Sequence, residues 1–260
     1  MAQAQRLDEA VAKRAGVTRS RARSLIIAGR VRVDGHPMTK PGTSVPAGAA
    51  LEVERPSPYV SRGGEKLEAA LDAFGIDVAG MRALDVGAST GGFTDCLLHR
   101  AAARVTAVDV GYGQIALALR DDPRVTVVER TNFRLLLDDA FGEPFDCIVI
   151  DASFISVVTI VERAKAYLAT GGAIVALVKP QFEAGRKRLS RGGVVRDDVV
   201  RGEIALEVRD AVAKRGFVVC DVTRSPLRGP AGNVELFFLL RPVGTPVNDA
   251  KIVAAAEDRT

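Results

Sequence analysis

Seven short apolar runs between residues 83 and 240 constrain the fold more than any other feature of the sequence. They are residues 83–86, 105–110, 125–128, 145–151, 173–178, 217–222 and 234–240. The middle runs are almost entirely apolar, as strands covered on both faces should be. Helical patterns at 156–168 and 198–214 fit crossovers between parallel strands. Because only a Pro/Gly-rich loop joins the last two runs, we predict a seven-stranded, doubly wound (Rossmann-like) α/β sheet whose last strand is antiparallel.

A glycine-rich turn follows the first apolar run. Residues 85–94 read DVGASTGGFT and lead from a predicted strand into a predicted helix at 93–99. Glycines at such a junction let a ligand lie against the backbone, with amide groups turned towards it. The spacing matches neither the dinucleotide fingerprint nor the phosphate loop, and no lysine closes the turn. The pattern G-x-S/T-x-G-G favours a site for S-adenosylmethionine, with a turn that binds nothing as the alternative; the expected contacts are Gly87, Ser89, Thr90, Gly91, Gly92 and Phe93.

Polar residues follow the next two runs. Asp109 lies 22 residues after Gly87, where a doubly wound fold places the acid that hydrogen-bonds a pair of ribose hydroxyls. Asn132 follows the third run, where the edge of an adenine would be read. Each of them alone is more typical of a strand-end cap. Because the carboxyl ends of parallel strands meet in one crevice, we expect Gly87, Asp109 and Asn132 together to bind a nucleoside cofactor.

Positive charge is concentrated at the start of the chain. The first 60 residues hold ten Lys and Arg against five Asp and Glu, whereas the other 200 hold 26 against 27. This asymmetry suggests a polyanionic partner, with a solvated basic face as the alternative. Helical patterns at 6–15 and 18–28, the second with Leu25, Ile26 and Ile27 facing inward, precede a hairpin signal at Asp34-Gly35. We predict a small α+β domain over 1–55, a Pro-containing linker at 56–60 and a large domain over 61–260.

The small domain resembles the RNA-binding module shared by ribosomal small-subunit protein four, several pseudouridine synthases and tyrosyl-tRNA synthetase. The matching residues are RLD at 6–8, SRA at 20–22 before LI at 25–26, and GRVRVDG at 29–35. The resemblance implies that basic side chains contact RNA phosphates, which supplies affinity rather than sequence reading. These side chains are Arg6, Arg14, Arg19, Arg21, Arg23 and Lys40.

Several classes of protein are disfavoured by composition. No run approaches the ~20 apolar residues that cross a bilayer, and the first residues lack a hydrophobic signal core. Cys96, Cys147 and Cys220 are isolated and odd in number, with no C-x-x-C or Cys/His cluster, so we expect no metal and no disulfide. Their apolar surroundings suggest buried thiols in a reducing compartment. We therefore expect a monomeric cytoplasmic protein with no membrane partner.

Four charged residues border the predicted strands. Asp151 and Lys179 end the fourth and fifth runs, and Glu235 begins the last. Lys66 lies in a predicted helix before the first strand, in the segment SRGGEKL at 61–67. Any one of them alone could simply mark the exit of a strand into solvent. Because the three strand ends meet at one edge of the sheet, we expect all four side chains to cluster there.

The chain resembles the TlyA (haemolysin A) family of ribosomal RNA 2′-O-methyltransferases, whose catalytic domain is similar to the FtsJ heat-shock methyltransferase. The resemblance rests on SRGG-x-KL at 61–67, the turn at 85–94, DVGYGQ at 109–114, TN at 131–132, DASFI at 151–155, LVKPQFE at 177–183 and GPAGNVE at 229–235. It implies a Lys-Asp-Lys-Glu tetrad formed by Lys66, Asp151, Lys179 and Glu235, and cytidine in ribosomal RNA as the substrate. One departure is Pro58-Tyr59, where better-known members carry a tryptophan, so coupling through the linker is in doubt.

The tetrad suits transfer of a methyl group to a ribose 2′-hydroxyl, which must lose its proton as it attacks. We expect Lys179 to be the base, with Lys66 beside it as the like charge that lowers its pKa, and Asp151 and Glu235 to orient the two lysines. A base N-methyltransferase would carry prolines that are absent from DASF at 151–154, although Phe154 could still stack on an RNA base. A small-molecule methyltransferase would not need the basic N-terminal domain. The third alternative is a cytolysin or a non-catalytic RNA-binding protein. The loop RKRLSR at 186–191 is either a second basic contact or a solvated segment.

Overall fold

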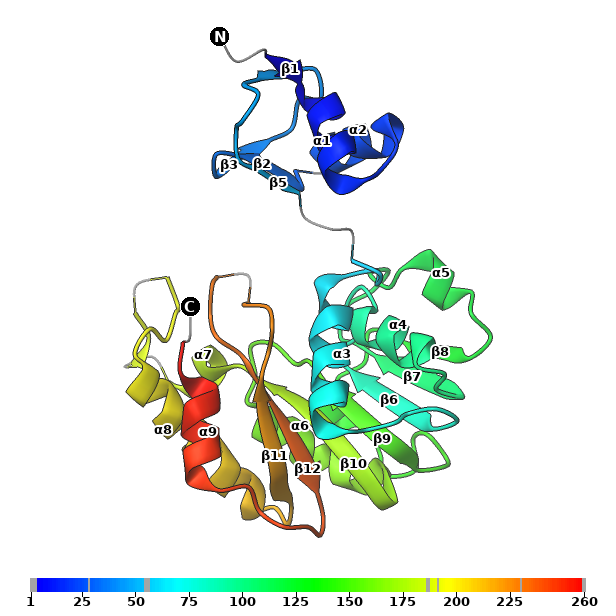
Figure 1. Ribbon diagram of the computed structural model, residues 1–260. Coiled ribbons are helices and arrows are strands. Elements are labelled where there is room, and N and C mark those ends of the chain that lie inside the picture. Colours follow the sequence, from blue (N-terminus) through cyan, green and yellow to red (C-terminus); the bar gives the residue numbers. More distant parts are fainter. Residues whose placement is uncertain are drawn as a thin grey trace. The chain divides into compact units, whose positions relative to one another are not determined.

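The chain forms two compact units, Met1–Ser57 and Pro58–Thr260, in the computed structural model (Figure 1). The structure describes residues 4–27, 29–53, 57–185, 188–190, 192–229 and 231–258. Residues 28 and 54–56, where the second helical pattern and the small domain were predicted to end and the linker to begin, therefore lie outside the described residues. The same holds for Arg186, Lys187 and Arg191 of the basic loop.

Two helices and two small sheets make up the first unit. Helices α1 (Leu7–Ala15) and α2 (Arg19–Ile27) pack beside a sheet of order β3-β2-β5, formed by His36–Met38, Val31–Val33 and Leu51–Val53. Strand β1 (Gln5–Arg6) pairs with β4 (Ser44–Val45). The Arg21 amide donates to Thr18 Oγ1 at 3.3 Å at the start of α2. The hairpin turn places Asp34 at φ +49° and Gly35 at φ +78°, as the sequence predicts.

The core of this unit contradicts one prediction. Leu25 and Ile26 are buried with Leu7, Val11 and Ala22, but the side chain of Ile27 is 66% exposed. Residues three and four apart share a helix face, so Ala22, Leu25 and Ile26 point together towards α1. Ile27 is one step further round the helix and faces away, so the prediction that it points inward is wrong.

The second unit is built on a seven-stranded sheet of order β11-β12-β10-β9-β6-β7-β8. Strand β12 is antiparallel to both of its neighbours, β10 and β11, and the remaining pairs are parallel. This confirms the predicted doubly wound sheet with an antiparallel last strand. The strands are β6 (Arg82–Val86), β7 (Arg104–Val108), β8 (Val125–Val128), β9 (Phe145–Ile150), β10 (Leu168–Val178), β11 (Val218–Arg224) and β12 (Leu236–Arg241).

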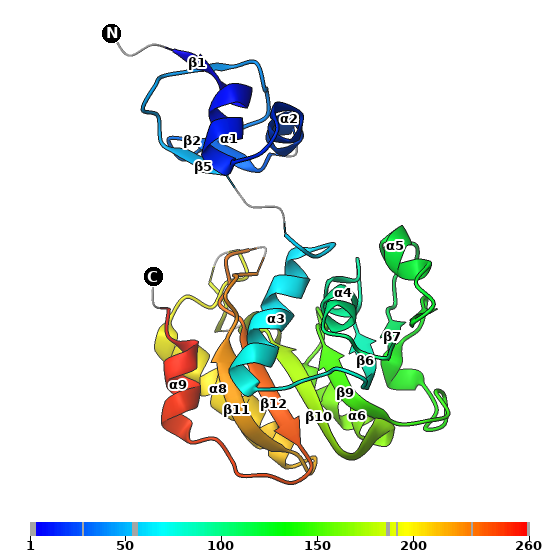
Figure 2. The ribbon, with the colours of Figure 1, turned by 45° about the vertical axis from the view of Figure 1, so that its right-hand side comes forward.

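Helices cover both faces of this sheet (Figures 1 and 2). One face packs against α3 (Arg62–Phe74) and α4 (Gly92–His99), and the other against α6 (Val157–Ala164), α8 (Asp198–Ala213) and α9 (Asp249–Ala256). Successive strand residues alternate between these two cores, with Ile148 in one and Val149 in the other. Short helices α5 (Leu117–Arg120), α7 (Pro180–Glu183), η1 (Phe133–Leu135) and η2 (Lys165–Tyr167) complete the unit.

Two smaller predictions are also tested by the packing. Cys96 and Cys147 are buried free thiols, whereas Cys220 is only partly buried, so its predicted full burial is wrong. Within the described part of the chain, no helix is both long enough and apolar enough to traverse a lipid bilayer.

Candidate active site

The register of the parallel strands brings the predicted polar residues to one edge of the sheet. Val86 pairs with Val108 on one side and with Ile150 on the other. The residues that follow these three are Gly87, Asp109 and Asp151, so they leave the sheet side by side. Lys179 leaves the next strand, β10, at the same edge.

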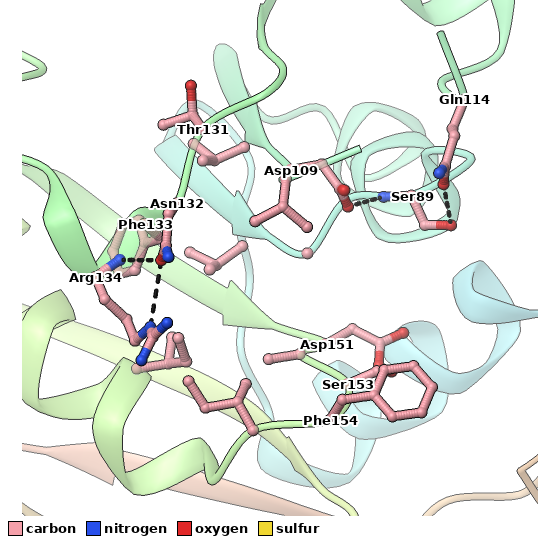
Figure 3. Close-up of a pocket in the computed structure, with 17 residues that line it drawn as sticks. Ser89, Asp109, Gln114, Thr131, Asn132, Phe133, Arg134, Asp151, Ser153 and Phe154 are labelled. Carbon is pink, nitrogen blue, oxygen red and sulfur yellow. Dashed lines mark hydrogen bonds between the residues drawn. The ribbon is translucent and has the colours of Figure 1, made fainter. Parts of the chain in front are cut away.

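Two adjoining cavities open at this edge. The larger, of about 500 Å³, is lined by Gly87, Asp109, Asn132 and Phe154, among others (Figure 3). The smaller, of about 280 Å³, is lined by all four members of the tetrad, Lys66, Asp151, Lys179 and Glu235, together with Thr90, Gly92 and Phe93. Gly87, Ser89, Asp151 and Ser153 line both cavities, which therefore form one crevice.

The glycines of the turn allow close packing of the backbone. At Gly87 (φ +88°), a Cβ atom would lie 2.6 Å from the Asp151 carbonyl oxygen, so this glycine lets two strand ends approach each other. At Gly91 (φ +93°) a Cβ would meet Leu119 Cδ1 at 2.3 Å, and at Gly92 it would meet Ser61 Oγ at 2.2 Å. Gly91 lines neither cavity of the crevice. Gly91 instead lets the turn pack closely against Leu119 of α5.

The predicted cofactor residues of the second and third strand ends also support the local backbone. Asp109 accepts a hydrogen bond from the Ser89 amide at 2.8 Å (Figure 3) and another from the Gly111 amide at 2.6 Å. The Asn132 side-chain oxygen accepts from the Arg134 amide at 3.2 Å, which caps η1. The Asp109 carboxylate keeps unused lone pairs, whereas the Asn132 oxygen also accepts from Arg134 Nε at 3.3 Å, so the group of Asn132 that is free among the described residues is its amide NH2 donor.

Two lysine–carboxylate pairs line the smaller cavity. Lys66 Nζ lies 2.6 Å from Glu235 Oε2, and both side chains are buried. Lys179 Nζ lies 2.6 Å from Asp151 Oδ1 and donates to Ser153 Oγ at 2.8 Å. Helix α3 supplies Lys66 and the segment before β12 supplies Glu235, so residues far apart in sequence meet here. Ser153 was not predicted as a site residue, since a serine after a strand gives no signal of its own.

Asp85 is a second residue that the sequence interpretation did not assign. It is fully buried on β6, directly before the turn, and its Oδ2 accepts from Thr94 Oγ1 at 2.7 Å. Its Oδ1 has no hydrogen-bond partner among the described residues. Burial raises the pKa of the Asp85 carboxyl from 3.8 to about 7. A carboxylate inside an apolar run was the available signal, because charged groups are rarely buried without a reason.

Backbone strain is concentrated around the crevice. Ser89 (φ +49°), Arg130 (φ +54°) and Phe154 (φ +64°) are non-glycine residues in the left-handed region, and each follows a strand end. Such strain is typical of functional sites. The Phe154 side chain is 90% exposed at the rim of the larger cavity, with its ring centroid 5.1 Å from that of Phe182. Its position leaves an aromatic face available to a ligand.

The predicted RNA-binding side chains of the first unit fall into two groups. Arg6 and Arg19 both pair with the buried carboxylate of Asp8, at 3.1 Å each, and remain about half exposed. These two arginines lower the pKa of Asp8 from 3.8 to about 2. The other four are exposed, and their side chains have no hydrogen-bond or ion-pair partner within the described ranges; they are Arg14, Arg21, Arg23 and Lys40.

The basic loop at 186–191 is described only in part. Arg188, its one described arginine, makes a bidentate pair with Glu207 on α8, at 2.9 and 2.7 Å. A guanidinium engaged in this way has less positive charge to offer a polyanion.

Comparisons with known proteins agree with this arrangement. Residues 59–241 match the model of the FtsJ-like methyltransferase family, and residues 5–51 match the S4 domain. The chain is 49% identical to the 16S/23S rRNA (cytidine-2'-O)-methyltransferase TlyA of Mycobacterium tuberculosis, over 93% of this chain and 91% of that protein. It is 41% identical to Hemolysin A of Brachyspira hyodysenteriae, over 88% of this chain and 97% of that protein. A solved structure of a putative hemolysin from Streptococcus thermophilus is 37% identical to the chain, with a TM-score of 0.76. The match covers 98% of this chain and 95% of that structure.

Proposed function

The chain belongs to the TlyA family of FtsJ-like methyltransferases, and we propose that it transfers a methyl group from S-adenosylmethionine to the ribose 2′-hydroxyl of cytidine in ribosomal RNA. The observation that carries the proposal is that two buried lysines each contact a carboxylate, Lys66 with Glu235 and Lys179 with Asp151, beside a cavity of nucleoside size. Burying charged groups lowers the stability of the fold, so such groups are typical of sites where they take part in chemistry, including proton transfer.

The residues of the larger cavity fit S-adenosylmethionine. Asp109 offers carboxylate oxygens to vicinal ribose hydroxyls, and Asn132 offers an amide to an adenine edge. Val110, Phe133 and Ile155 supply apolar surface for a flat ring. Asp151 lies where the two cavities join and places a negative charge towards a sulfonium. Ser89 and Thr90 add hydroxyls at the glycine turn.

In the proposed mechanism the bound cofactor supplies an electrophilic methyl group, and the side chains of the smaller cavity prepare the nucleophile. Lys179, positioned by Asp151 and Ser153, acts in its neutral amine form: its nitrogen lone pair accepts the proton of the 2′-hydroxyl as the oxygen takes the methyl group. Lys66, fixed by Glu235, stabilises the negative charge that develops on the attacking oxygen. Holding the oxygen and the methyl carbon in line contributes the rest of the rate enhancement.

The two units divide the work in this proposal. Residues 1–55 bind RNA through Arg14, Arg21, Arg23 and Lys40, with Arg6 and Arg19 contributing their exposed halves. Residues 61–260 bind the cofactor and carry out the transfer. Phe154 stacks on an RNA base at the mouth of the crevice. We propose a monomer acting in the cytoplasm, where ribosomal RNA is made and assembled.

Mass spectrometry of the product tests the proposal. Ribosomal RNA that lacks the modification is incubated with the protein and isotopically labelled S-adenosylmethionine, then digested to nucleosides. The expected product is labelled 2′-O-methylcytidine. The proposal would be contradicted by a label on a nucleobase. It would also be contradicted if the protein bound the cofactor but left the RNA unlabelled.

A further inference from the structure

A second polar hollow lies behind the crevice. Two adjoining cavities, of about 380 and 480 Å³, share Arg228, Val234 and Asp258. Four arginines line them, and Asp258 is the only acidic residue among the lining residues that the structure describes; the arginines are Arg196, Arg201, Arg224 and Arg228. We call this hollow the arginine pocket. The described lining therefore carries an excess of positive charge, which Asp258 and the Arg201–Asp198 pair reduce in part.

The arginine pocket and the crevice share one wall. Val234 and Glu235 are consecutive residues before β12, and they line different cavities. Val234 lines the arginine pocket, whereas Glu235 lines the smaller cavity of the crevice and binds Lys66. A Cβ at Gly229 would meet Glu235 Oε1 at 2.5 Å, so the backbone at Gly229 lies close to this carboxylate. The pocket is therefore one residue away from the tetrad.

Buried polar side chains hold the pocket in shape. Arg201, which is 2% exposed, donates to the carbonyl oxygens of Val195 (2.8 Å) and Arg196 (3.0 Å) and also pairs with Asp198. Asn233 is equally buried, and its side-chain oxygen accepts from the Val195 amide at 3.1 Å. These contacts fix the backbone that presents Arg196, so the site is preformed rather than assembled by a ligand.

Two of the four guanidiniums can bind an anion. The Arg196 side chain is exposed and has no partner in the part of the chain that the structure describes. Arg228 is paired at 2.6 Å with Asp258, and the two side chains are 45% and 29% exposed. A guanidinium has five N–H donors in a planar fork that matches a phosphate, so Arg228 keeps donors free beside its carboxylate.

We propose that the arginine pocket binds a phosphodiester of the RNA strand whose ribose enters the crevice, with Arg196 and Arg228 as the contacts and Asp258 as a carboxylate that competes for Arg228. This inference rests on the proposed function. A nucleotide in the crevice is joined to the strand by a 5′ and a 3′ phosphodiester. The arginine pocket, separated from the crevice by Val234 and Glu235, can receive one of these or the next phosphate along the strand. Contacts of this kind position the strand without reading its sequence.

Substitutions in the full-length protein test the pocket. Arg196→Ala and Arg228→Ala should each raise the Kd and KM for a ribosomal RNA fragment about threefold to tenfold, with kcat nearly unchanged, and reduce the slope of log Kd against log salt by about 0.7–1. Arg104→Ala is the matched control, because Arg104 is also exposed and without a described partner but lies at the start of β7, at the opposite edge of the sheet. Asp258→Asn should tighten RNA binding, whereas Asp249→Asn, which breaks the Arg209–Asp249 pair elsewhere, should not.

The outcomes separate this inference from the proposed function. Arg196 and Arg228 variants that bind RNA as the Arg104 variant does would overturn the pocket, even if the wild-type protein methylates RNA. Wild-type protein that binds RNA through these arginines but transfers no methyl group would support the pocket and contradict the proposed function. Calorimetric binding of S-adenosylhomocysteine checks that each variant is folded.

Discussion

The basic side chains that we assign to RNA binding in the first unit and to catalysis in the second differ in their surroundings. In the first unit, Arg14, Arg21 and Arg23 are exposed and have no partner within the described ranges. In the second, Lys66 and Lys179 are buried and each lies 2.6 Å from a carboxylate. Exposed, unpaired cations can bind phosphates in many arrangements and release counterions, which gives salt-dependent affinity. Buried, paired cations are held in one geometry, which suits a chemical step.

Two buried aspartates show the same contrast. Asp8 is surrounded by Arg6 and Arg19, and its pKa is lowered to about 2. Asp85 has one hydroxyl partner, Thr94, and burial raises its pKa to about 7. The carboxylate of the first unit is thus held in its charged form and organises arginines, whereas burial shifts that of the second towards its neutral form.

The largest expected effect tests the catalytic half of this comparison. Lys179→Met removes the proposed base but keeps an unbranched side chain, so single-turnover methyl transfer should fall by about two to four orders of magnitude. RNA affinity should change little, because Lys179 is buried. Lys214→Met, at an exposed lysine after α8, is the control and should retain full activity. Comparable rates in the two variants would remove Lys179 from the mechanism.

The second prediction concerns Asp85 and pH. Its folded-state pKa is raised, so folding takes up a proton between about pH 4 and pH 7, and the free energy of unfolding of the second unit should fall as pH rises through that window. Asp85→Asn removes this titration and should gain stability over the wild type by up to roughly 4 kcal/mol at pH 8. If the free energy of unfolding had the same pH dependence in the wild type and in Asp85→Asn, Asp85 would not be the titrating group.

Tyrosine fluorescence during urea unfolding isolates the relevant unit. The three tyrosines, Tyr59, Tyr112 and Tyr167, all lie in the second unit, and the chain has no tryptophan. The corresponding change in the first unit, Asp8→Asn, should leave this fluorescence transition unchanged.

Core packing in the first unit gives a third prediction. Ile26→Ala should lower the free energy of unfolding by about 2–5 kcal/mol, because it opens a cavity beside Leu7 and Val11. Ile27→Ala, one residue further on, should change it by less than about 0.5 kcal/mol, because that side chain is 66% exposed. Hydrogen exchange of the α1 and α2 amides measures both; similar losses would show that Ile27 is packed after all.

The smallest expected effect tests the RNA-binding half. Replacing Arg21 and Arg23 together by alanine should weaken RNA binding about tenfold and lower the salt slope by about 1.5–2, with kcat at saturating RNA retained. Asp85 and the lysine pairs lie in the other unit, so cofactor affinity should be unchanged. An unaltered salt slope would indicate that these arginines form only a solvated face.

The sequence predicted the fold and the convergence of the site residues for a physical reason. Apolar runs define strands, and parallel strands deliver whatever follows them to one edge, so Asp109, Asp151 and Lys179 could be placed together in advance. Contacts that depend on side-chain geometry could not. The pairing of Lys66 with Glu235 spans 169 residues, and the need for glycine at position 87 arises from the Asp151 carbonyl of another strand.

Nucleotide-resolution mapping of 2′-O-methyl groups on ribosomal RNA tests the central claim most directly. RNA is compared from cells that express the wild-type protein, the Lys179→Met variant or neither. The account predicts one or more cytidines that carry a 2′-O-methyl group only when the wild-type protein is present. A methylation pattern that is identical in all three, or one that Lys179→Met restores in full, would contradict it.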